Sequence, residues 1–455
     1  MMYQVLNPAT GALIEEFPTA TDAQVMDAVA RSHEAYLSWR GTSIEDRVLV
    51  AKRAAALFRE RTDELAAIIT QEMGKRIEES RGELQIVCDI FTYYAENGPS
   101  LMADEPLAIE GGAAVIQKRP LGALIGIMPW NYPYYQVARF AAPNLILGNT
   151  ILLKHARNCP RSAAAIERLL HDAGVPRDAY INLYATGDQI AAMLADDRIQ
   201  GVSLTGSERA GAAVAAVAGT NLKKCVLELG GSDPLIVLDA ADLDKTVDDA
   251  VRARMGNCGQ ACNAPKRMIV LGGLYDAFVS KLAGRMAEFV PGDPADPRTT
   301  LAPLSSQAAA DELVEQIRDA VEQGASLLVG GHRIDGPGAY VQPAVLTGVT
   351  EEMRAHREEL FGPAVVVYRA DSEDEAVALA NDSVYGLGAS VFSADPDRAR
   401  RVGDRLDAGM VSINAAGGSQ ADLPFGGIKR SGIGRELGPL GMEEFMNKRV
   451  VRIPS

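Results

Sequence analysis

The sequence has few cysteines, a deficit of positive charge and no long apolar run, and each shortage excludes a class of protein. Five cysteines in 455 residues form an odd and sparse set, which argues against a disulfide scaffold. Lys and Arg number 45 against 60 Asp and Glu, and the formal net charge of −15 disfavours binding to a nucleic-acid backbone or to a membrane surface. No stretch reaches the ~18–20 consecutive apolar residues that a membrane span needs.

The rest of the composition is that of a globular protein. Apolar residues make up 47% of the chain and charged residues 23%, and the length predicts two or three domains. The first residues, MMYQVLNPATG, contain neither the basic segment nor the apolar core of a secretory signal. We therefore expect a cytoplasmic protein with no nucleic acid and no membrane among its partners.

Short apolar runs alternate with helical patterns in two series, which predicts two α/β domains. Pro160 and Gly174 mark the start and the end of one of the helices. Strands and helices at this spacing form right-handed units with a parallel sheet, and such sheets bind ligands at the carboxyl ends of their strands. The expected strands are 123–128, 150–154, 180–184, 202–204, 225–229 and 235–238 in the first series, and 268–271, 326–329, 364–368, 389–392 and 410–414 in the second.

The segments before these series have different patterns. Thr21 and Gln24 can form a capping box at the start of a helix. Helical spacing continues over residues 45–73 and ends at Gly74. The segment 101–118 is short, mixed and rich in Gly and Ala, and we expect an extended hairpin there.

The segment NCGQACNAPKR, residues 257–267, contains two of the cysteines. Gly259 and Asn263 stand among the turn-forming residues around Cys262, so this is not an apolar core run. A turn of this kind can expose a thiol together with backbone N–H groups, as a nucleophilic cysteine requires. The alternative is a small buried cysteine with a packing role alone.

Two further polar residues follow predicted strands. Glu228 ends an apolar run in VLELGGSDP, just before two glycines, and places a carboxylate at the carboxyl end of a strand. Asn131 follows another strand in MPWNYPYY, where a side-chain amide can donate to a developing oxyanion. The alternatives are a solvated acid at a strand end and a turn asparagine.

The segment SLTGSERAG leads from a predicted strand into a helix. Gly206 and Gly211 do not complete the G-x-G-x-x-G fingerprint, so the nucleotide signal is weak, although a helix N-terminus can still hold a phosphate. Lys154 ends an earlier strand in ILLKHAR, with Arg157 three residues later. Without further context, these two residues are interpreted as a pair of surface cations.

Taken together, the ordered motifs PWNYP, LLK, TGS, ELGGSDP, GQAC, EELFGP and PFGGIKRSG resemble those of the aldehyde dehydrogenase superfamily. The resemblance runs from NPATG at residues 7–11 to KRVVR at residues 448–452. It implies an aldehyde-dehydrogenase-like α/β fold with two Rossmann-like domains and a small β oligomerisation arm. The implied ranges are 1–101 and 119–229 for the cofactor-binding domain, 230–430 for the catalytic domain, and 102–118 and 431–455 for the arm. Because such arms pair between subunits, we expect a homodimer or a homotetramer.

The resemblance also implies the reaction, which is the oxidation of an aldehyde to the carboxylic acid with NAD(P). Cys262 would form a thiohemiacetal and then a thioester, Asn131 would hold the oxyanion, and Glu228 would activate the hydrolytic water. One alternative is a coenzyme-A-acylating enzyme, although such relatives usually lack the base. Another is a non-enzymatic structural relative, although such proteins tend to lose the nucleophile or the base. No metal site is expected, because no His or acid cluster accompanies the two sulfurs.

The same resemblance implies the cofactor site. Lys154 would contact the adenosine ribose, Ser207 the pyrophosphate and Glu359 the nicotinamide ribose. Many NAD-using relatives have Glu three residues after the Lys, whereas this chain has Arg157. A cation attracts a 2′-phosphate that an acid would repel, so we expect NADP, with NAD as the alternative. The other expected cofactor-binding residues are Trp130, Gly206, Leu229 and Phe361.

The substrate prediction rests on a resemblance to compact bacterial succinate-semialdehyde dehydrogenases, which share PWN-x-P-Y-Y-Q and LLKHA. Arg139 occupies the position of an arginine that meets the distal carboxylate, and the alternative is a structural arginine paired with an acid. The place of a second such arginine is taken by Gly256, and Arg254 lies two residues earlier. We expect succinate semialdehyde or, failing that, another small aldehyde. The other expected substrate residues are Tyr135, Gln136 and Ser419.

Cys258 lies four residues before Cys262. A disulfide between them requires a suitable bend in the segment, and it would switch the enzyme off under oxidation. The alternative is an incidental small residue.

Overall fold

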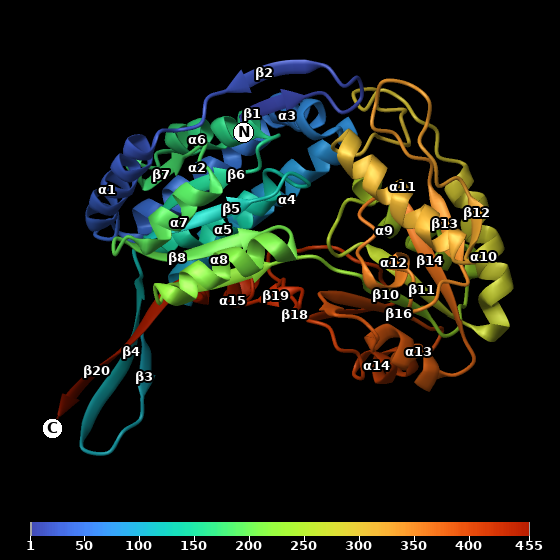
Figure 1. The fold of residues 1–455 in the computed structure, drawn as a ribbon. Coiled ribbons are helices and arrows are strands. Elements are labelled where there is room, and N and C mark those ends of the chain that lie inside the picture. Colours follow the sequence, from blue (N-terminus) through green and yellow to red (C-terminus); the bar gives the residue numbers. More distant parts are fainter. Residues whose placement is uncertain (1, 455) are drawn as a thin grey trace.

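Two sheets, each covered by helices on both faces, lie side by side, and a ribbon of three strands projects from one of them (Figure 1). The structure is a computed structural model that describes residues 2–454. Among these residues, no helix is both long and apolar enough to cross a membrane.

The first sheet has six strands, of which all but the first are parallel. Its order is β19 (Gly432–Ile433), β9 (Lys224–Glu228), β8 (Ile199–Thr205), β5 (Ala123–Met128), β6 (Thr150–His155) and β7 (Tyr180–Asn182). Leu124 of β5 is buried on one face of the sheet and Ile125 on the other, because successive side chains of a strand alternate between its faces. The continuous apolar run of β5 therefore marks a strand that is buried on both sides.

Helices on the two faces of this sheet come from different parts of the chain. One face packs against α1 (Asp22–Trp39), α7 (Gly187–Ala195) and α8 (Glu208–Thr220). The other packs against α2 (Ile44–Glu60), α3 (Thr62–Met73), α4 (Ile77–Leu101), α5 (Tyr135–Leu147), α6 (Pro160–Ala173) and α15 (Gly438–Glu443). A short 3₁₀ turn, Arg177–Ala179, precedes β7.

The predicted N-terminal helices are confirmed, with one difference. The capping box of Thr21 and Gln24 is present at the start of α1. The pattern over residues 45–73 is two helices, because the chain leaves helical geometry at Arg61 and Thr62 turns its hydroxyl back to the carbonyl of Phe58. Gly74 ends α3 with a φ of 79°, a left-handed conformation that favours glycine.

The second sheet has seven strands, and β12 alone is antiparallel to its neighbour. Its order is β12 (Ser326–Val329), β13 (Ala344–Thr347), β14 (Ala364–Ala370), β11 (Pro265–Leu271), β10 (Asp233–Val237), β16 (Gly388–Phe392) and β17 (Met410–Ile413). One face packs against α9 (Leu243–Met255), α10 (Gly272–Ala287), α11 (Gln307–Glu322) and α12 (Arg354–Arg357), and the other against α13 (Glu373–Asn381) and α14 (Pro396–Gly403).

The projecting arm consists of β3 (Glu105–Leu107), β4 (Gly112–Pro120) and β20 (Met446–Pro454). The predicted hairpin over 101–118 is confirmed by the antiparallel pair β3–β4. The C-terminal tail divides between two places, because β19 pairs with β9 of the first sheet whereas β20 pairs with β4. The predicted ranges also include residues 1 and 455, which lie outside the described residues.

Two further pairs of short strands complete the fold. They are β1 (Tyr3–Leu6) with β2 (Leu13–Phe17), and β15 (Tyr385–Gly386) with β18 (Ile428–Lys429). Most of the residues singled out by the sequence lie at or after the carboxyl ends of β5, β6, β8 and β9. Of the others, Cys262 precedes β11, Glu359 and Phe361 precede β14, and Ser419 follows β17. This brings residues from both sheets toward one region between them.

Candidate active site

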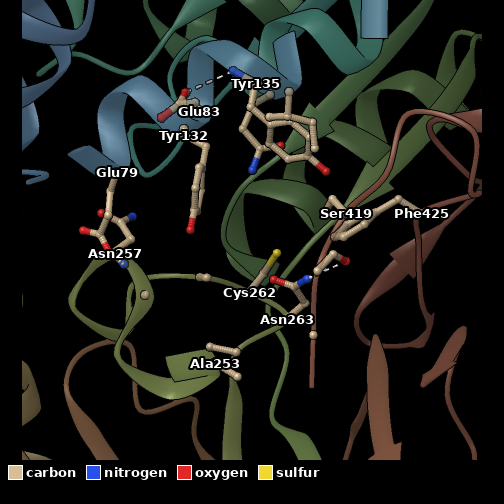
Figure 2. Close-up of a pocket in the computed structure, with 18 of the residues that line it drawn as sticks. Glu79, Glu83, Tyr132, Tyr135, Ala253, Asn257, Cys262, Asn263, Ser419 and Phe425 are labelled. Carbon is tan, nitrogen blue, oxygen red and sulfur yellow. Dashed lines mark hydrogen bonds between the residues drawn. The ribbon is translucent and has the colours of Figure 1, made fainter. Parts of the chain in front are cut away.

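Two cavities meet at Cys262 and Gln136, the residues that line both. The larger has a volume of about 410 Å³ and includes Tyr132, Tyr135, Ser419 and Phe425 in its wall. Figure 2 shows the sulfur of Cys262 directed into this cavity, with the two tyrosines on the opposite side. The smaller cavity, of about 250 Å³, is lined by Pro129, Trp130, Asn131, Gln136, Thr205, Gly206, Ser207, Leu229, Gly230, Cys262, Glu359 and Phe361. A group bound at Cys262 is therefore accessible from two sides.

A turn with left-handed backbone conformation precedes Cys262 and positions it between the two cavities. Asn257, Cys258 and Gly259 have φ angles of 51°, 53° and 76°, a conformation that costs energy for the first two. The Asn257 side-chain amide donates to the backbone carbonyl of Asn131 at 2.9 Å, which joins the turn to the end of β5. A β-carbon at Gly259 would lie 2.2 Å from the carbonyl oxygen of Gly362, so this position has no room for a side chain.

The thiol of Cys262 is neutral in this environment. Burial raises its pKa to about 12, although the residue is partly exposed to the cavities. The cations of Arg139 and Lys266 lower the pKa, and the carboxylates of Glu359 and Glu228 raise it further. A proton acceptor is therefore needed before the sulfur can attack a carbonyl.

The amide of Asn131 lies in the smaller cavity, beside the nucleophile's own loop. Its Nδ2 donates to the carbonyl oxygen of Gln260 at 3.1 Å, two residues before Cys262, and the side chain is buried. The amide is thus held by the segment that carries the thiol, which suits a donor that must meet an oxyanion on the same carbon as the sulfur.

Glu228 is a buried carboxylate at the end of β9, and neither of its oxygens has a hydrogen-bond partner within residues 2–454. Burial raises its pKa well above the ordinary value, and the nearby Arg139 partly offsets this. The carboxylate packs on Gly426, where a β-carbon would be 2.6 Å from Oε1. It stands behind the residues that line the two cavities, so it must turn toward Cys262 to act on a group there.

Six of the eight expected cofactor residues line the smaller cavity. The rings of Trp130 and Phe361 meet edge to face, with centroids 5.7 Å apart. The Ser207 hydroxyl caps α8 by accepting from the backbone N–H of Ala210 at 3.3 Å. The six are Trp130, Gly206, Ser207, Leu229, Glu359 and Phe361.

The other two, Lys154 and Arg157, lie outside that lining, near the N-terminal strand β1. The Lys154 ammonium lies 5.9 Å from the ring centroid of Tyr3, and the carbonyl of Arg157 accepts from the N–H of Gln4 at 3.0 Å. Burial, followed by repulsion from Arg157, lowers the pKa of Lys154 to about 8. Two cations near one another favour a ligand group with two negative charges.

Three of the four expected substrate residues, Tyr135, Gln136 and Ser419, line the larger cavity. Arg139 is the exception. Its side chain is inaccessible to solvent and its Nε lies 2.7 Å from Oε2 of Glu436. Its guanidinium stands behind the wall, 4.9 Å from the ring centroid of Tyr135 and 4.4 Å from that of Phe425. The structure thus places Arg139 as the alternative interpretation describes, as an arginine paired with an acid.

Arg254 also points away from the larger cavity. It is fully buried and donates to the carbonyl oxygens of Leu360 and Ala364, each at 2.7 Å. It therefore holds the EELFGP segment, to which Glu359 belongs, against the turn before Cys262.

Cys258 and Cys262 face different parts of the molecule. The Cys258 thiol is buried and lies 3.2 Å from the carbonyl oxygen of Ala302, within the core of the second sheet. Cys262 packs instead at the edge of the core of the first sheet. This arrangement fits the incidental residue better than the disulfide.

The sequence reasoning missed several charged residues of the site. Glu79 and Glu83 of α4 line the larger cavity, and Glu83 accepts from the N–H groups of Tyr134 and Tyr135 at the start of α5. Lys75 pairs with Glu83, and its ammonium lies 3.7 Å from the ring centroid of Tyr132. These residues stand in an ordinary amphipathic pattern, and no local signal distinguishes them from a solvated helix face.

The geometry agrees with what the chain is similar to. A family model described as "Aldehyde dehydrogenase family" matches residues 1–451. The succinate-semialdehyde dehydrogenase [NADP(+)] of Deinococcus radiodurans is 56% identical over 450 residues, covering 99% of this chain and 94% of that protein. The enzyme of the same name from Mycolicibacterium paratuberculosis is 43% identical, covering 100% and 97%.

A solved structure of a succinic semialdehyde dehydrogenase is also similar to this chain in its fold. The crystal structure of succinic semialdehyde dehydrogenase from Streptococcus pyogenes, in complex with NADP+, is 42% identical, covers 100% of both chains and superposes with a TM-score of 0.98. From the matched motifs, the cavities that meet at a cysteine and these relatives, we conclude that the chain belongs to the aldehyde dehydrogenase family.

Proposed function

We propose that the protein oxidises succinate semialdehyde to succinate, with NADP+ as the oxidant. The observation that carries the proposal is the place of Cys262, at the junction of a cavity for the aldehyde and a cavity for the nicotinamide. The names of the relatives from Deinococcus radiodurans and Streptococcus pyogenes support both the substrate and the cofactor.

The residues of the smaller cavity fit a nicotinamide dinucleotide. Trp130, Leu229 and Phe361 supply an apolar surface, and Ser207 stands at the N-terminus of α8, where a pyrophosphate is favoured. Glu359 can accept hydrogen bonds from ribose hydroxyls. A β-carbon at Gly230 would lie 2.7 Å from its Oε2, so position 230 has no room for a side chain. When bound, the nicotinamide ring accepts the hydride that leaves the substrate carbon.

The protein's own groups carry the remaining steps. Cys262 passes its proton to Glu228, directly or through water, and Glu228 releases it to solvent. The thiolate attacks the aldehyde carbon and forms a thiohemiacetal, whose oxyanion Asn131 stabilises; one such donor contributes about 3–4 kcal/mol. After the hydride has left, the carbon is a thioester of Cys262. Glu228 takes a proton from water, and the resulting hydroxide releases the acid and restores the thiol. Burial raises the pKa of Glu228, so this carboxylate holds a proton more tightly than an exposed glutamate does, as a base for water requires.

A small uncharged aldehyde is the second candidate substrate. Its support is that no Lys or Arg is among the residues that line the larger cavity, whereas Glu79 and Glu83 both are. The two carboxylates are paired with Arg76 and Lys75 respectively, so they do not present two uncompensated charges to a substrate. The Ser419 hydroxyl and the Tyr135 phenol remain as donors for a distal carboxylate.

Reduction of NADP+ and of NAD+ at 340 nm, with succinate semialdehyde and butanal as matched four-carbon aldehydes, tests the proposal. We expect the highest kcat/KM for succinate semialdehyde with NADP+. A preference for butanal would overturn the substrate, and a requirement for coenzyme A would overturn the hydrolytic product.

We also infer that the arm joins subunits into a homodimer or a homotetramer. Val450 and Ile453 of β20 expose 65% and 64% of their surface on a ribbon that projects from the first sheet (Figure 1), and apolar side chains so placed favour a covering partner. Light scattering of wild type and Val450→Asp measures this, and a monomeric wild type would contradict it.

All five cysteines are free, which supports a reducing compartment such as the cytoplasm.

A further inference from the structure

Lys266, at the start of β11, is a buried ammonium beside the nucleophile. Its side chain is 1% exposed, and its Nζ donates to the carbonyl oxygens of Ala261 at 2.7 Å and of Cys262 at 2.5 Å. These two carbonyls belong to the two peptides that flank the α-carbon of Cys262. Burying an ammonium is costly unless it is paired and hydrogen-bonded, so the three oxygen contacts of this group indicate a built arrangement.

The third contact of Lys266 is with the cofactor side of the site. Oε1 of Glu359 lies 2.9 Å from Nζ, and Glu359 lines the smaller cavity. The other carboxylate oxygen packs on Gly230, where a β-carbon would approach it to 2.7 Å. The neighbouring Gly231 packs against the peptide of Cys262, since a β-carbon at Gly231 would lie 2.5 Å from the carbonyl oxygen of Cys262. The peptide of the nucleophile and the carboxylate are thus held in place by the same ammonium.

We propose that Lys266 is a positioning residue that ties the peptide of Cys262 to the carboxylate of Glu359. One buried cation then supplies positive charge beside the thiol and fixes the carboxylate in the cofactor cavity. The proposal rests on the proposed function only in taking Cys262 as the nucleophile. It requires no particular aldehyde and no choice between NADP and NAD.

The charges that face the thiol come from four elements. The cations are Arg139 of α5 and Lys266 of β11, and the acids are Glu228 of β9 and Glu359 of the EELFGP segment. The phenols of Tyr132 and Tyr135 also face it and are neutral, because burial raises their pKa. Removal of either cation should therefore make the thiolate rarer, and removal of the Glu359 charge should make it more abundant.

The test measures the thiolate without cofactor or aldehyde. Iodoacetamide alkylates the thiolate, and mass spectrometry of the Cys262 peptide gives the rate at each pH. Because the pKa lies far above pH 7.5, a rise of one unit lowers the rate there about tenfold. The half-buried Cys225 of β9, in the same digest, is an internal control whose rate should not change.

Two substitutions of the lysine separate charge from packing. We expect Lys266→Met to lower the Cys262 rate at pH 7.5 about tenfold and to move the pH profile upward, whereas Lys266→Arg should stay within about threefold of wild type. A purely structural role would change stability and leave the pH profile in place. A folded Lys266→Met protein with a wild-type profile would overturn the proposal.

A substitution of Glu359, the residue paired with Lys266, keeps the test decisive if Lys266→Met does not fold. The loss of Lys266 removes the ion-pair partner of Glu359 and one of the two cations, Lys266 and Arg267, that lower the pKa of the buried Asp233. Glu359→Gln retains the lysine and lies in a cavity wall. We expect it to raise the Cys262 rate at pH 7.5 several-fold, and an unchanged or lower rate would overturn the proposal. Failure of the succinate-semialdehyde assay would leave this measurement intact, so the two proposals fail separately.

Discussion

Arg139 and Glu436 form an ion pair, with Nε 2.7 Å from Oε2 and no more than 5% of either side chain exposed. Glu436 also accepts from the Ser203 hydroxyl at 3.0 Å, so the acid is held by β8 of the first sheet. The pair keeps a positive charge near Cys262 and Glu228 without placing it in the wall of the larger cavity. It therefore acts on both reacting groups through space.

Arg139→Met should destabilise the protein by about 3–5 kcal/mol, because it removes the cation that is paired with the buried Glu436. If the variant folds, kcat/KM should fall by the same factor for succinate semialdehyde and for butanal, since the guanidinium does not reach the aldehyde cavity. Urea unfolding and the two-aldehyde assay measure the two effects. A fall in kcat/KM for succinate semialdehyde alone would show that Arg139 binds the distal carboxylate of the substrate.

Glu228→Gln should lower steady-state turnover by about 10²–10⁴-fold, the usual contribution of a general base. It should also change how stability depends on pH. The folded protein holds the Glu228 proton more tightly than the unfolded chain, so this group favours folding most below its ordinary pKa of 4.5, and that advantage is lost as the pH rises toward the higher folded-state pKa. Glutamine carries no charge to bury at high pH. The variant should therefore melt above wild type at pH 8, and the difference should shrink toward pH 4.5.

Scanning calorimetry at these two pH values measures the effect. The exposed Glu60→Gln substitution on α2 is the matched control and should show no such trend. A Glu228→Gln protein that is less stable than wild type at pH 8 would mean that the carboxylate is charged and held by partners in solution.

Arg157→Glu should reverse the cofactor preference. An acid at this position repels a 2′-phosphate and can accept from the 2′-hydroxyl of NAD, so we expect kcat/KM for NADP+ to fall about tenfold or more and that for NAD+ to rise. Initial rates with each cofactor measure the change. Arg318→Glu on α11 makes the same charge change on an exposed side chain that is paired with Glu322, and it should leave the ratio unaltered.

Cys258→Ala should leave the sensitivity to peroxide unchanged, because its thiol faces Ala302 and not the cavities. The loss of a small buried side chain should cost about 1 kcal/mol of stability. Activity after peroxide, with and without dithiothreitol, measures the first effect. If the variant resisted oxidation better than wild type, the result would support a disulfide switch between Cys258 and Cys262.

Local patterns predicted most of the strands and the residues at their ends. The runs 123–128 and 326–329 have the predicted bounds. The first is buried on both faces, which leaves an uninterrupted apolar signal, whereas the second is a largely exposed edge strand. The run 180–184 is a strand only over 180–182, where it pairs with β6. The resemblance placed Cys262 and six cofactor residues, all of which the structure brings to the two cavities.

Long-range pairs could not be predicted in this way. The partner of Arg139 is Glu436, near the other end of the chain, and the partner of Lys266 is Glu359 in a loop of the second sheet. Each is an ordinary charged residue within its own segment, and burial alone gives it a role. The N-terminal pattern 45–73 similarly hid a break at Arg61, since both halves have the same helical period.

Strand β1 carries none of the family's motifs and still contacts Lys154 and Arg157, the two residues that we expect at the adenosine end of the dinucleotide. Tyr3 lies beneath Lys154 and donates its hydroxyl to the carbonyl of Ala185 at 2.8 Å, while Gln4 binds the carbonyl of Arg157. A variant library aimed at cofactor exchange should thus randomise Tyr3 together with Arg157, because the ring lies against the Lys154 ammonium and the next residue, Gln4, holds the backbone of Arg157.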